Sequence, residues 1–403
     1  MSELADSLNI LLDRHREALT EFTGDLLRIP SVNGVDPESA IAARIAEQAR
    51  RYGLDAQIVG ADLQRPNVIV TVGEGEPGLI LIGHLDTVAP GDRSRWSHDP
   101  FGGECAESRM YGRGAIDTKG GMAAALYALI LLKEWGGLRG SVRFIGVPDE
   151  ESGATGTLGI KWLHQQGLLR GTGAIYCYSG HDIILGHRGL YRCKITCYGE
   201  SAHPGFPAWQ NGEHGANAVT GMARLLIALE QIQTRYSTTP YFERFRTMIT
   251  PGTVIQGGAA INIVPDRCES YVDARLTPET SAAQVRTWID AEITRLQAER
   301  PKLKFSIETI SDLPAAISDA NAPLFRAVES ALGQVTGEAP PRVVAGPANE
   351  GYLLIERGIP TVCGFGPIGA NAHSADEYVE IDSLSDAALI YALTAVEMEA
   401  LHE

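Results

Sequence analysis

The sequence predicts an α/β protein: a central mixed, mostly parallel sheet flanked by helices, with a smaller α+β domain inserted into it. Three observations lead to this prediction. Short apolar runs bounded by glycine and proline alternate with helical patterns in residues 1–186 and again near the C-terminus. Residues 187–301 follow a different order of strands and helices. Residues suited to metal binding lie on both sides of that stretch, which indicates an insertion.

The first part of the chain supplies most of the sheet. A helix is expected over residues 37–52, where apolar residues recur at helical spacing and Gly53 follows at the C-cap. A second, strongly apolar helix is expected over 120–135. Buried strands read as short apolar runs, and they are expected over six ranges: 55–59, 67–72, 79–82, 141–147, 174–178 and 361–365.

The inserted segment has the pattern of a split βαββαβ unit, which is ferredoxin-like. Strands are expected over 190–198, 253–257, 268–276 and 303–308, with helices over 215–232 and 281–296. We therefore expect one domain made of residues 1–186 and 302–403, and an inserted domain of residues 187–301.

Composition narrows the class of protein. The 403 residues are 44% hydrophobic and carry a formal net charge of −16, which argues against nucleic acid or an anionic membrane surface as a partner. Residues 1–14 lack the pattern of a signal peptide, and no apolar run approaches the roughly 20 residues that span a bilayer. Six scattered cysteines without a Cys-x-x-Cys pair suggest reduced thiols. We expect a cytoplasmic protein.

Histidines and carboxylates follow the expected strands in chain order. His84 comes just after the strand 79–82, Glu150 and Glu151 come after 141–147, and His373 follows 361–365, while Asp117 precedes the long helix. Ligands in α/β sheets bind beyond the carboxyl ends of strands, so these side chains can share one site. Two divalent cations held there would activate water for hydrolysis, and a spare glutamate would take its proton. Taken alone, the paired glutamates would more often be solvated loop residues, but beside His84 and Asp117 they favour a metal site.

Several motifs resemble one enzyme family over nearly the whole chain. They are Gly-His-x-Asp-x-Val at 83–88, the stretches 96–101 and 111–121, the glutamates at 150–151, Ala-His at 202–203 with Gly-Ala-Asn-Ala at 215–218, and His-Ser at 373–374. The chain resembles the dinuclear zinc aminoacylase and carboxypeptidase family, peptidase family M20. Its members include acetylornithine deacetylase, succinyl-diaminopimelate desuccinylase and glutamate carboxypeptidase. The resemblance implies a zinc-exopeptidase type of sheet and an inserted lid that serves dimerisation.

The resemblance also implies a role for each motif residue. His84 would bind the first metal, Asp117 would bridge both metals, and Glu151 with His373 would bind the second. Glu150 would be the general base that accepts the proton of the attacking water. Asp86 would accept a proton from the imidazole of the first ligand and fix its tautomer.

Three residues of the inserted domain match substrate-binding positions of the family. His203 would reach the site of the partner subunit and stabilise the oxyanion, Arg275 would pair with a substrate carboxylate, and Asn262 would add a polar contact. Each has an alternative reading. His203 could only organise a turn before proline, Asn262 could cap a loop, and Arg275 could pair with Asp273 on the strand surface.

One expected ligand is missing. The family usually supplies a glutamate or aspartate for the first metal about ten residues before a motif like 187–189, whereas residues 175–182 here contain no glutamate. Cys177 stands at the expected position and a thiolate can bind zinc, with His181 and Asp182 as substitutes. Cys177 could instead be a small apolar filler, which would leave one firmly bound metal. The segment 345–351, with Asn349, also departs from the family pattern.

These features predict a metal-dependent hydrolase that cleaves an amide C–N bond of a small carboxylate-bearing substrate, such as an N-acyl amino acid, or acts like a carboxypeptidase. One or two divalent ions are expected, zinc first, with manganese or cobalt as alternatives. We expect a homodimer formed through the inserted domain. Two alternatives remain: a hydrolytic deaminase of an unusual, aromatic amine, and a non-catalytic binding protein on the same fold.

Overall fold

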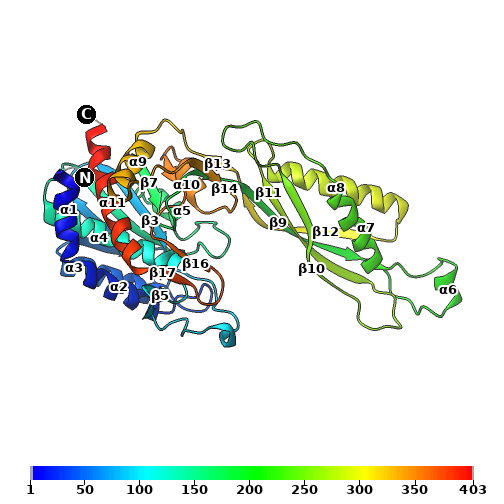
Figure 1. Ribbon diagram of the computed structural model, residues 1–403. Coiled ribbons are helices and arrows are strands. Elements are labelled where there is room, and N and C mark those ends of the chain that lie inside the picture. The colour runs from blue at the N-terminus through cyan, green and yellow to red at the C-terminus, as the bar shows by residue number, and fades with distance from the viewer. Residues whose placement is uncertain (1–2, 402–403) are drawn as a thin grey trace. The chain divides into compact units, whose positions relative to one another are not determined.

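The computed structural model describes residues 3–401 and divides into two compact units (Figure 1). Unit 1 comprises the chain up to His187, Ile317–Ala345 and the chain from Asn349 onward. Unit 2 comprises Arg188–Ala316 and the short piece Gly346–Ala348. The second boundary lies after Ala316, later than the expected boundary after Pro301, because the last strand of the inserted segment pairs within unit 2.

Unit 1 is built on a six-stranded sheet. Its strands, in spatial order, are β1 (Asp55–Val59), β2 (Asn67–Gly73), β6 (Ser141–Val147), β3 (Pro77–His84), β7 (Gly173–Tyr176) and β15 (Thr361–Val362). The last four run parallel to one another, whereas β1 and β2 are antiparallel to their neighbours. The expected mixed, mostly parallel sheet is therefore confirmed, and the parallel strands bring their carboxyl ends to one edge.

Helices cover this sheet and bury its apolar side chains. They are α1 (Glu3–Asp13), α2 (Arg16–Arg28), α3 (Ser39–Arg51), α4 (Gly120–Trp135), α5 (Ile160–Gln165), α9 (Pro323–Thr336), α10 (Gly351–Ile355) and α11 (Ile381–Leu401). Helix α4 packs across β2, β3 and β6, and α11 packs beside α4. Within residues 3–401, the segment Ala115–Trp135 is long and apolar enough to cross a membrane, contrary to our expectation, but 94% of its apolar window is buried in the protein. It is the core helix of unit 1.

Two smaller sheets complete unit 1. One joins β13 (Ala316–Ile317), β8 (Ile183–His187) and β14 (Arg342–Ala345). The other joins β16 (Gly369–Ala370), β17 (Tyr378–Glu380), β5 (Arg109–Tyr111) and β4 (Glu104–Ala106). Pairing of β17 with β5 brings the loop that carries His373 alongside the turn that carries Asp117, although about 250 residues separate them in the chain. This pairing assembles the candidate site.

Unit 2 has the expected ferredoxin-like order. Its elements, in chain order, are β9 (Gly189–Tyr198), α6 (Pro207–Gln210), α7 (Ala218–Glu230), β10 (Met248–Gly257), β11 (Arg267–Leu276), α8 (Ala282–Glu299) and β12 (Lys304–Leu313). The strands form one antiparallel sheet in the order β10-β11-β9-β12. Residues alternate between buried and partly exposed along β11, and the buried ones pack against α7 and α8 to form a separate core. The strand β10 is left at an edge.

Candidate metal centre

The candidate site lies where the parallel strands of unit 1 end. His84 is the last residue of β3, Glu150 and Glu151 lie in the turn that follows β6, and Tyr178 comes two residues after β7. Because β6, β3 and β7 are parallel neighbours, their carboxyl ends meet at one edge of the sheet. The remaining residues arrive from the turn before α4 and from the loop after β16.

Four of these side chains touch one another directly. His84 Nε2 lies 2.8 Å from Asp117 Oδ1, and His373 Nε2 lies 3.2 Å from Asp117 Oδ2. His373 Nε2 is also 3.1 Å from Glu151 Oε1. Asp117 therefore stands between the two histidines, with one carboxylate oxygen toward each. This arrangement suits the role of a carboxylate shared by two metal ions, which the family resemblance implies for Asp117.

Asp86 contacts both the His84 ring and the turn that carries Glu150 and Glu151. Its main-chain oxygen lies 2.9 Å from His84 Nδ1, while its carboxylate oxygen Oδ1 is 3.6 Å away. The nearer acceptor for the imidazole is therefore the main chain. The carboxylate also accepts hydrogen bonds from the main-chain N–H groups of Glu150, at 3.3 Å, and Glu151, at 3.0 Å. Asp86 thus fixes both the His84 ring and the turn that carries the paired glutamates.

The electrostatics of the site distinguish its carboxylates. Burial opposes ionisation of Asp117, but hydrogen bonds from His373 and His84 outweigh it and lower the pKa of Asp117. Hydrogen bonds to Asp117 and Glu151 raise the pKa of His373 to about 10. Burial raises the pKa of Glu150 to about 8, with the charges of Glu151 and Asp117 adding to the effect and His84 opposing it. Glu150 is thus a stronger base than Asp117.

The donor atoms fit a divalent metal ion. Asp117, Glu151 and His373 each offer one ligand atom, and these atoms lie within 4.8 Å of one another. His84, Glu150 and Glu151 form a second such group. Carboxylate and imidazole donors suit zinc, manganese and cobalt. Glu151 belongs to both groups, so the two sets of donors are contiguous.

Tyr178 is a site residue that sequence reasoning missed. Its hydroxyl donates a 3.1 Å hydrogen bond to Glu150 Oε1, and its ring lies 5.6 Å from the ring of His84. Burial and the neighbouring carboxylates raise its pKa well above the usual value, so the phenol is neutral and remains a donor. It immediately follows Cys177, where a tight turn closed by a 2.9 Å hydrogen bond from the Tyr178 N–H to the Tyr176 main-chain oxygen ends the strand, and the sequence carries no signal of that turn.

Cys177 does not join the metal donors among the described residues. Its Sγ lies 3.6 Å from the main-chain oxygen of Ile175, and the residue is fully buried. Burial raises the pKa of its thiol to about 12, which keeps the sulfur protonated. The substitute His181 pairs instead with Glu338 at 3.0 Å. These contacts match the alternative reading of Cys177 as a buried filler.

The other three expected site residues lie in unit 2. His203 is exposed, and its Nδ1 accepts a hydrogen bond from the Gly205 N–H at 3.1 Å. Asn262 is exposed on the loop between β10 and β11. Arg275 is paired with Asp273, at 2.7 Å from Nε to Oδ1 and 3.2 Å from Nη2 to Oδ2. The fork of Arg275 is therefore occupied by Asp273, as in the alternative reading, and a substrate would have to displace that partner.

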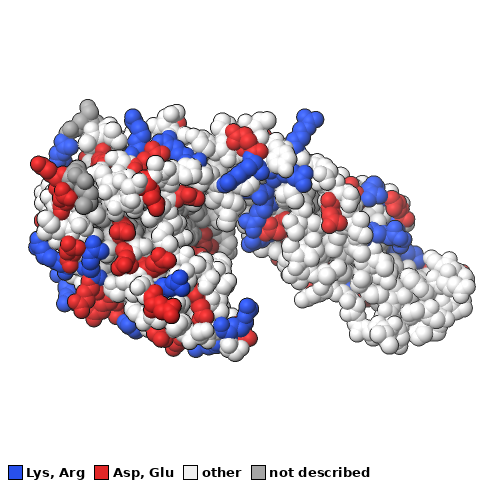
Figure 2. Space-filling model, viewed as in Figure 1, with Lys and Arg blue, Asp and Glu red and all other residues white. Residues whose placement is uncertain are grey.

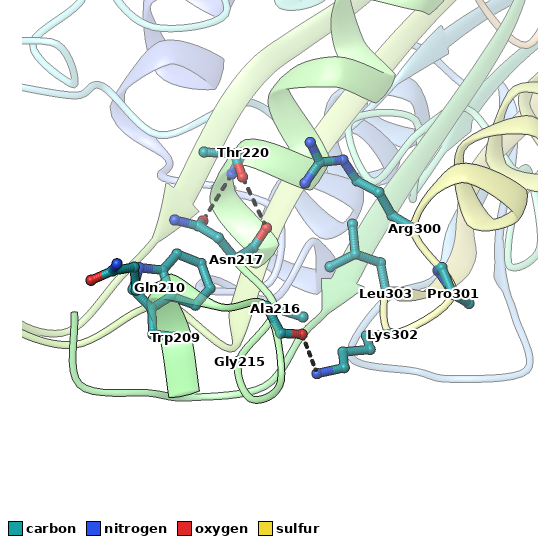
Figure 3. A pocket seen from close by; sticks show the side chains of 11 residues that line it. Trp209, Gln210, Gly215, Ala216, Asn217, Thr220, Arg300, Pro301, Lys302 and Leu303 are labelled. Carbon is teal, nitrogen blue, oxygen red and sulfur yellow. Dashed lines mark hydrogen bonds between the residues drawn. The ribbon is translucent and has the colours of Figure 1, made fainter. Parts of the chain in front are cut away.

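Unit 2 also contains a cavity of about 570 Å³ (Figure 3). It lies between the N-terminus of α7 and the turn that precedes β12, with Trp209 on one side and Leu303 on the other. The side chain of Asn217 caps α7 at its edge. None of the candidate metal-site residues lines this cavity.

Glu377 braces the site and was also missed. Its Oε2 accepts from Arg113 Nη1 at 2.5 Å and from the Gly114 N–H at 3.1 Å, and its Oε1 accepts from the N–H groups of Ile116 and Asp117, both at 3.1 Å. The buried carboxylate of Glu377, four residues after His373, thus holds the turn that carries Asp117. We call this set of contacts the Glu377 brace. Its spacing in the sequence gives no signal of this role.

Comparison with known proteins agrees with this geometry. Residues 80–397 match the model of peptidase family M20/M25/M40. The chain belongs to this family. It is 30% identical over 381 residues to a succinyl-diaminopimelate desuccinylase from Gluconobacter oxydans, with 91% of this chain and 94% of that protein covered.

Solved structures share the same fold. The M20 family metallo-carboxypeptidase Sso-CP2 from Sulfolobus solfataricus matches with a TM-score of 0.78 at 18% identity, covering 96% of this chain and 99% of that chain. The di-peptidase Dug1p from Saccharomyces cerevisiae matches with a TM-score of 0.78 at 14% identity, covering 99% of each chain. Family membership confirms that the protein is a metal-dependent hydrolase of amide C–N bonds.

Proposed function

We propose that this enzyme removes the acyl group from a small N-acylated amino acid that carries a free carboxylate. The observation that carries the proposal is the convergence of Asp117, Glu151 and His373 beside Glu150, a half-buried carboxyl group that makes no ion pair in the described residues. The succinyl-diaminopimelate desuccinylases, which match over nearly the whole chain, support the substrate class.

The residues divide the work as follows. Asp117, Glu151 and His373 would hold one metal ion. His84, together with Asp117, would hold a second metal ion. The bound metal supplies a polarised carbonyl and a more acidic water molecule. Glu150 would accept the proton of the water that attacks the carbonyl carbon and would return it to the nitrogen that leaves. Asp86 keeps His84 and the turn at Glu150 in place.

The nature of the metal follows from the donors. Zinc is our first choice because its usual ligands are imidazole and carboxylate at four-coordinate sites, with manganese and cobalt as alternatives. The group of Asp117, Glu151 and His373 is the firmer site in this proposal. The group around His84 lacks a thiolate, because the sulfur of Cys177 is directed elsewhere.

We also propose that the enzyme is a homodimer formed through unit 2. The edge strand β10 exposes Val254 and Ile255, whose exposed fractions are 45% and 50%, and α7 exposes Ile227 at 61%. The surface over α6 and the neighbouring end of β10 carries few charged side chains (Figure 2). An unpaired strand edge with exposed apolar side chains is a natural interface for a second copy. His203 would act in the partner's site.

A cytoplasmic location completes the proposal. All six cysteines are free, which suits a reducing compartment. Figure 2 also shows acidic and basic side chains intermixed over the visible face of unit 1, without a broad basic surface. The expected partner is therefore a small substrate rather than a nucleic acid or a membrane.

The test is a hydrolysis assay with metal analysis. Purified protein is loaded with zinc, manganese or cobalt and incubated with N-succinyl and N-acetyl amino acids, and release of a primary amine is measured. Glu150→Gln should abolish release while it retains the metal, whereas Glu47→Gln, an exposed glutamate on α3, should leave the rate unchanged. Absence of amine release with every acyl amino acid and metal would refute the proposed substrate class.

A second candidate is hydrolytic deamination of an aromatic amine. One observation favours it: the ring of Tyr178 lies partly exposed beside His84 and stacks on Tyr176 at 4.8 Å, which offers a flat surface to an aromatic substrate. Release of ammonia from an aminobenzoate, without release of a carboxylic acid from any acyl amino acid, would favour this reaction over deacylation.

A further inference from the structure

A chain of buried groups leads from the core of unit 1 into the candidate site. Glu350 is fully buried, and its Oε2 accepts a 3.1 Å hydrogen bond from the Tyr176 hydroxyl. The ring of Tyr176 stacks on that of Tyr178 at 4.8 Å with an interplanar angle of 22°. Tyr178 in turn donates to Glu150. Glu350 therefore anchors one tyrosine, which supports the ring of the next.

The path depends on the geometry at the end of β7. Tyr176 is its last residue, and the Tyr178 N–H donates to the Tyr176 main-chain oxygen at 2.9 Å, so a tight turn at Cys177 brings the two tyrosine rings into one stack. Cys177 lies between them, and its sulfur faces the core. The stack leaves the Tyr178 ring little freedom to rotate. Its hydroxyl is held at the carboxylate of Glu150 by packing as well as by the hydrogen bond.

Glu150 needs such support. Its main-chain N–H is fixed by Asp86 at 3.3 Å, but that bond leaves the side chain free to turn. The hydrogen bond from Tyr178 occupies Oε1 and so leaves Oε2 as the oxygen that can take a proton. A general base must be held within hydrogen-bond reach of the proton that it abstracts, and a small misplacement costs rate.

We propose that Tyr178 is a positioning residue for the reaction: through its hydrogen bond to Oε1 it holds the carboxylate of Glu150 in the orientation that accepts the proton of water. The Tyr176–Glu350 pair fixes the Tyr178 ring from behind. This inference rests on the proposed role of Glu150 as the base. In this role Tyr178 binds no metal ion and does not contact the substrate; it acts only through Glu150.

The kinetic test compares two variants that each lose one phenol hydroxyl. Tyr178→Phe keeps the stacked ring and removes only the hydroxyl, and kcat should fall about tenfold to a hundredfold with little change in KM. Metal content should stay that of the wild type. The matched control is Tyr391→Phe on α11, whose hydroxyl donates to the Phe365 main-chain oxygen at 2.7 Å, outside the site. It should lower Tm but leave kcat unchanged.

A second measurement needs no turnover. Tyrosine labelled with ¹³C at Cζ is incorporated into the metal-loaded protein, and the Tyr178 signal is assigned by its loss in Tyr178→Phe. Glu150→Gln should shift that signal, since the hydroxyl then faces a neutral amide, and should leave the Tyr391 signal in place.

The outcomes separate this inference from the proposed function. A wild-type kcat in Tyr178→Phe would overturn the positioning role even if the enzyme hydrolyses acyl amino acids. So would a Tyr178 signal whose chemical shift is unchanged by Glu150→Gln. If no acyl amino acid is hydrolysed but the signal shifts as expected, the substrate class is wrong and the hydrogen bond stands.

Discussion

Replacing Glu377 by glutamine tests whether the Glu377 brace holds the metal donors in place. The pair of Glu377 with Arg113 is buried, with side-chain exposures of 0% and 2%. Removing one charge leaves the guanidinium buried without its partner, which costs about 3–5 kcal/mol of unfolding free energy. The amide also turns an NH₂ group toward main-chain N–H donors that the carboxylate had satisfied.

The assay is thermal unfolding of the metal-stripped protein, followed by circular dichroism. For a unit of this size, a loss of that order lowers Tm by roughly 6–15 °C. Metal affinity, measured by competition with a chelator, should fall about 10–100-fold, because the turn that carries Asp117 loses the contacts that orient it.

The control is Glu329→Gln. Glu329 also pairs with an arginine, Arg342, through two contacts, but those side chains are 33% and 23% exposed. Its loss should cost under about 1 kcal/mol and leave metal affinity unchanged. Equal, small effects of the two substitutions would refute the reasoning, because burial would then make no difference to the Glu377 brace.

Three further predictions follow from the site and from unit 2. Cys177→Ala should retain the wild-type metal content measured by elemental analysis, whereas Glu151→Gln should lose metal. Loss of metal in Cys177→Ala would show that the Cys177 sulfur is a metal ligand after all. In the metal-stripped folded protein the pKa of His373 is raised to about 10, whereas in the unfolded chain it is near 6.5. Protonation of His373 therefore stabilises the fold fully below pH 6.5, and the free energy of unfolding should fall as the pH rises from about 6.5 to about 10. His373→Gln should flatten this slope in urea unfolding, and an unchanged slope would contradict the assignment. If the enzyme is the proposed dimer, Ile255→Lys should give the mass of a monomer in light scattering, and an unchanged dimer mass would exclude β10 from the interface.

Local sequence patterns predicted most of the fold because they report burial directly. The strands β1 and β6 match the expected ranges, and α4 begins and ends where its apolar pattern does. The four apolar residues among the seven of 141–147 predict from the sequence alone a strand buried on both faces. The ferredoxin-like order of unit 2 could be read in the same way.

The register of side chains at strand ends could not be read so easily. Counting along the sequence placed Cys177 at the position of a metal ligand, but the chain turns after Tyr176 and directs Tyr178 into the site instead. A shift of one residue exchanges the two faces of a strand, so an error of one position reverses the assignment. Only the tertiary structure decides which of the two side chains enters the site.

The sequence by itself determined the class of chemistry, because histidines and carboxylates after buried strands suit few sites other than a metal centre. The tertiary structure decided which of these groups meet: pairing of β17 with β5 brings His373 to Asp117. It also decided the partners of Glu377 and Tyr178, whose contacts come from segments distant in the chain. Composition and spacing record what a side chain can do, whereas long-range packing sets the neighbours with which it does it.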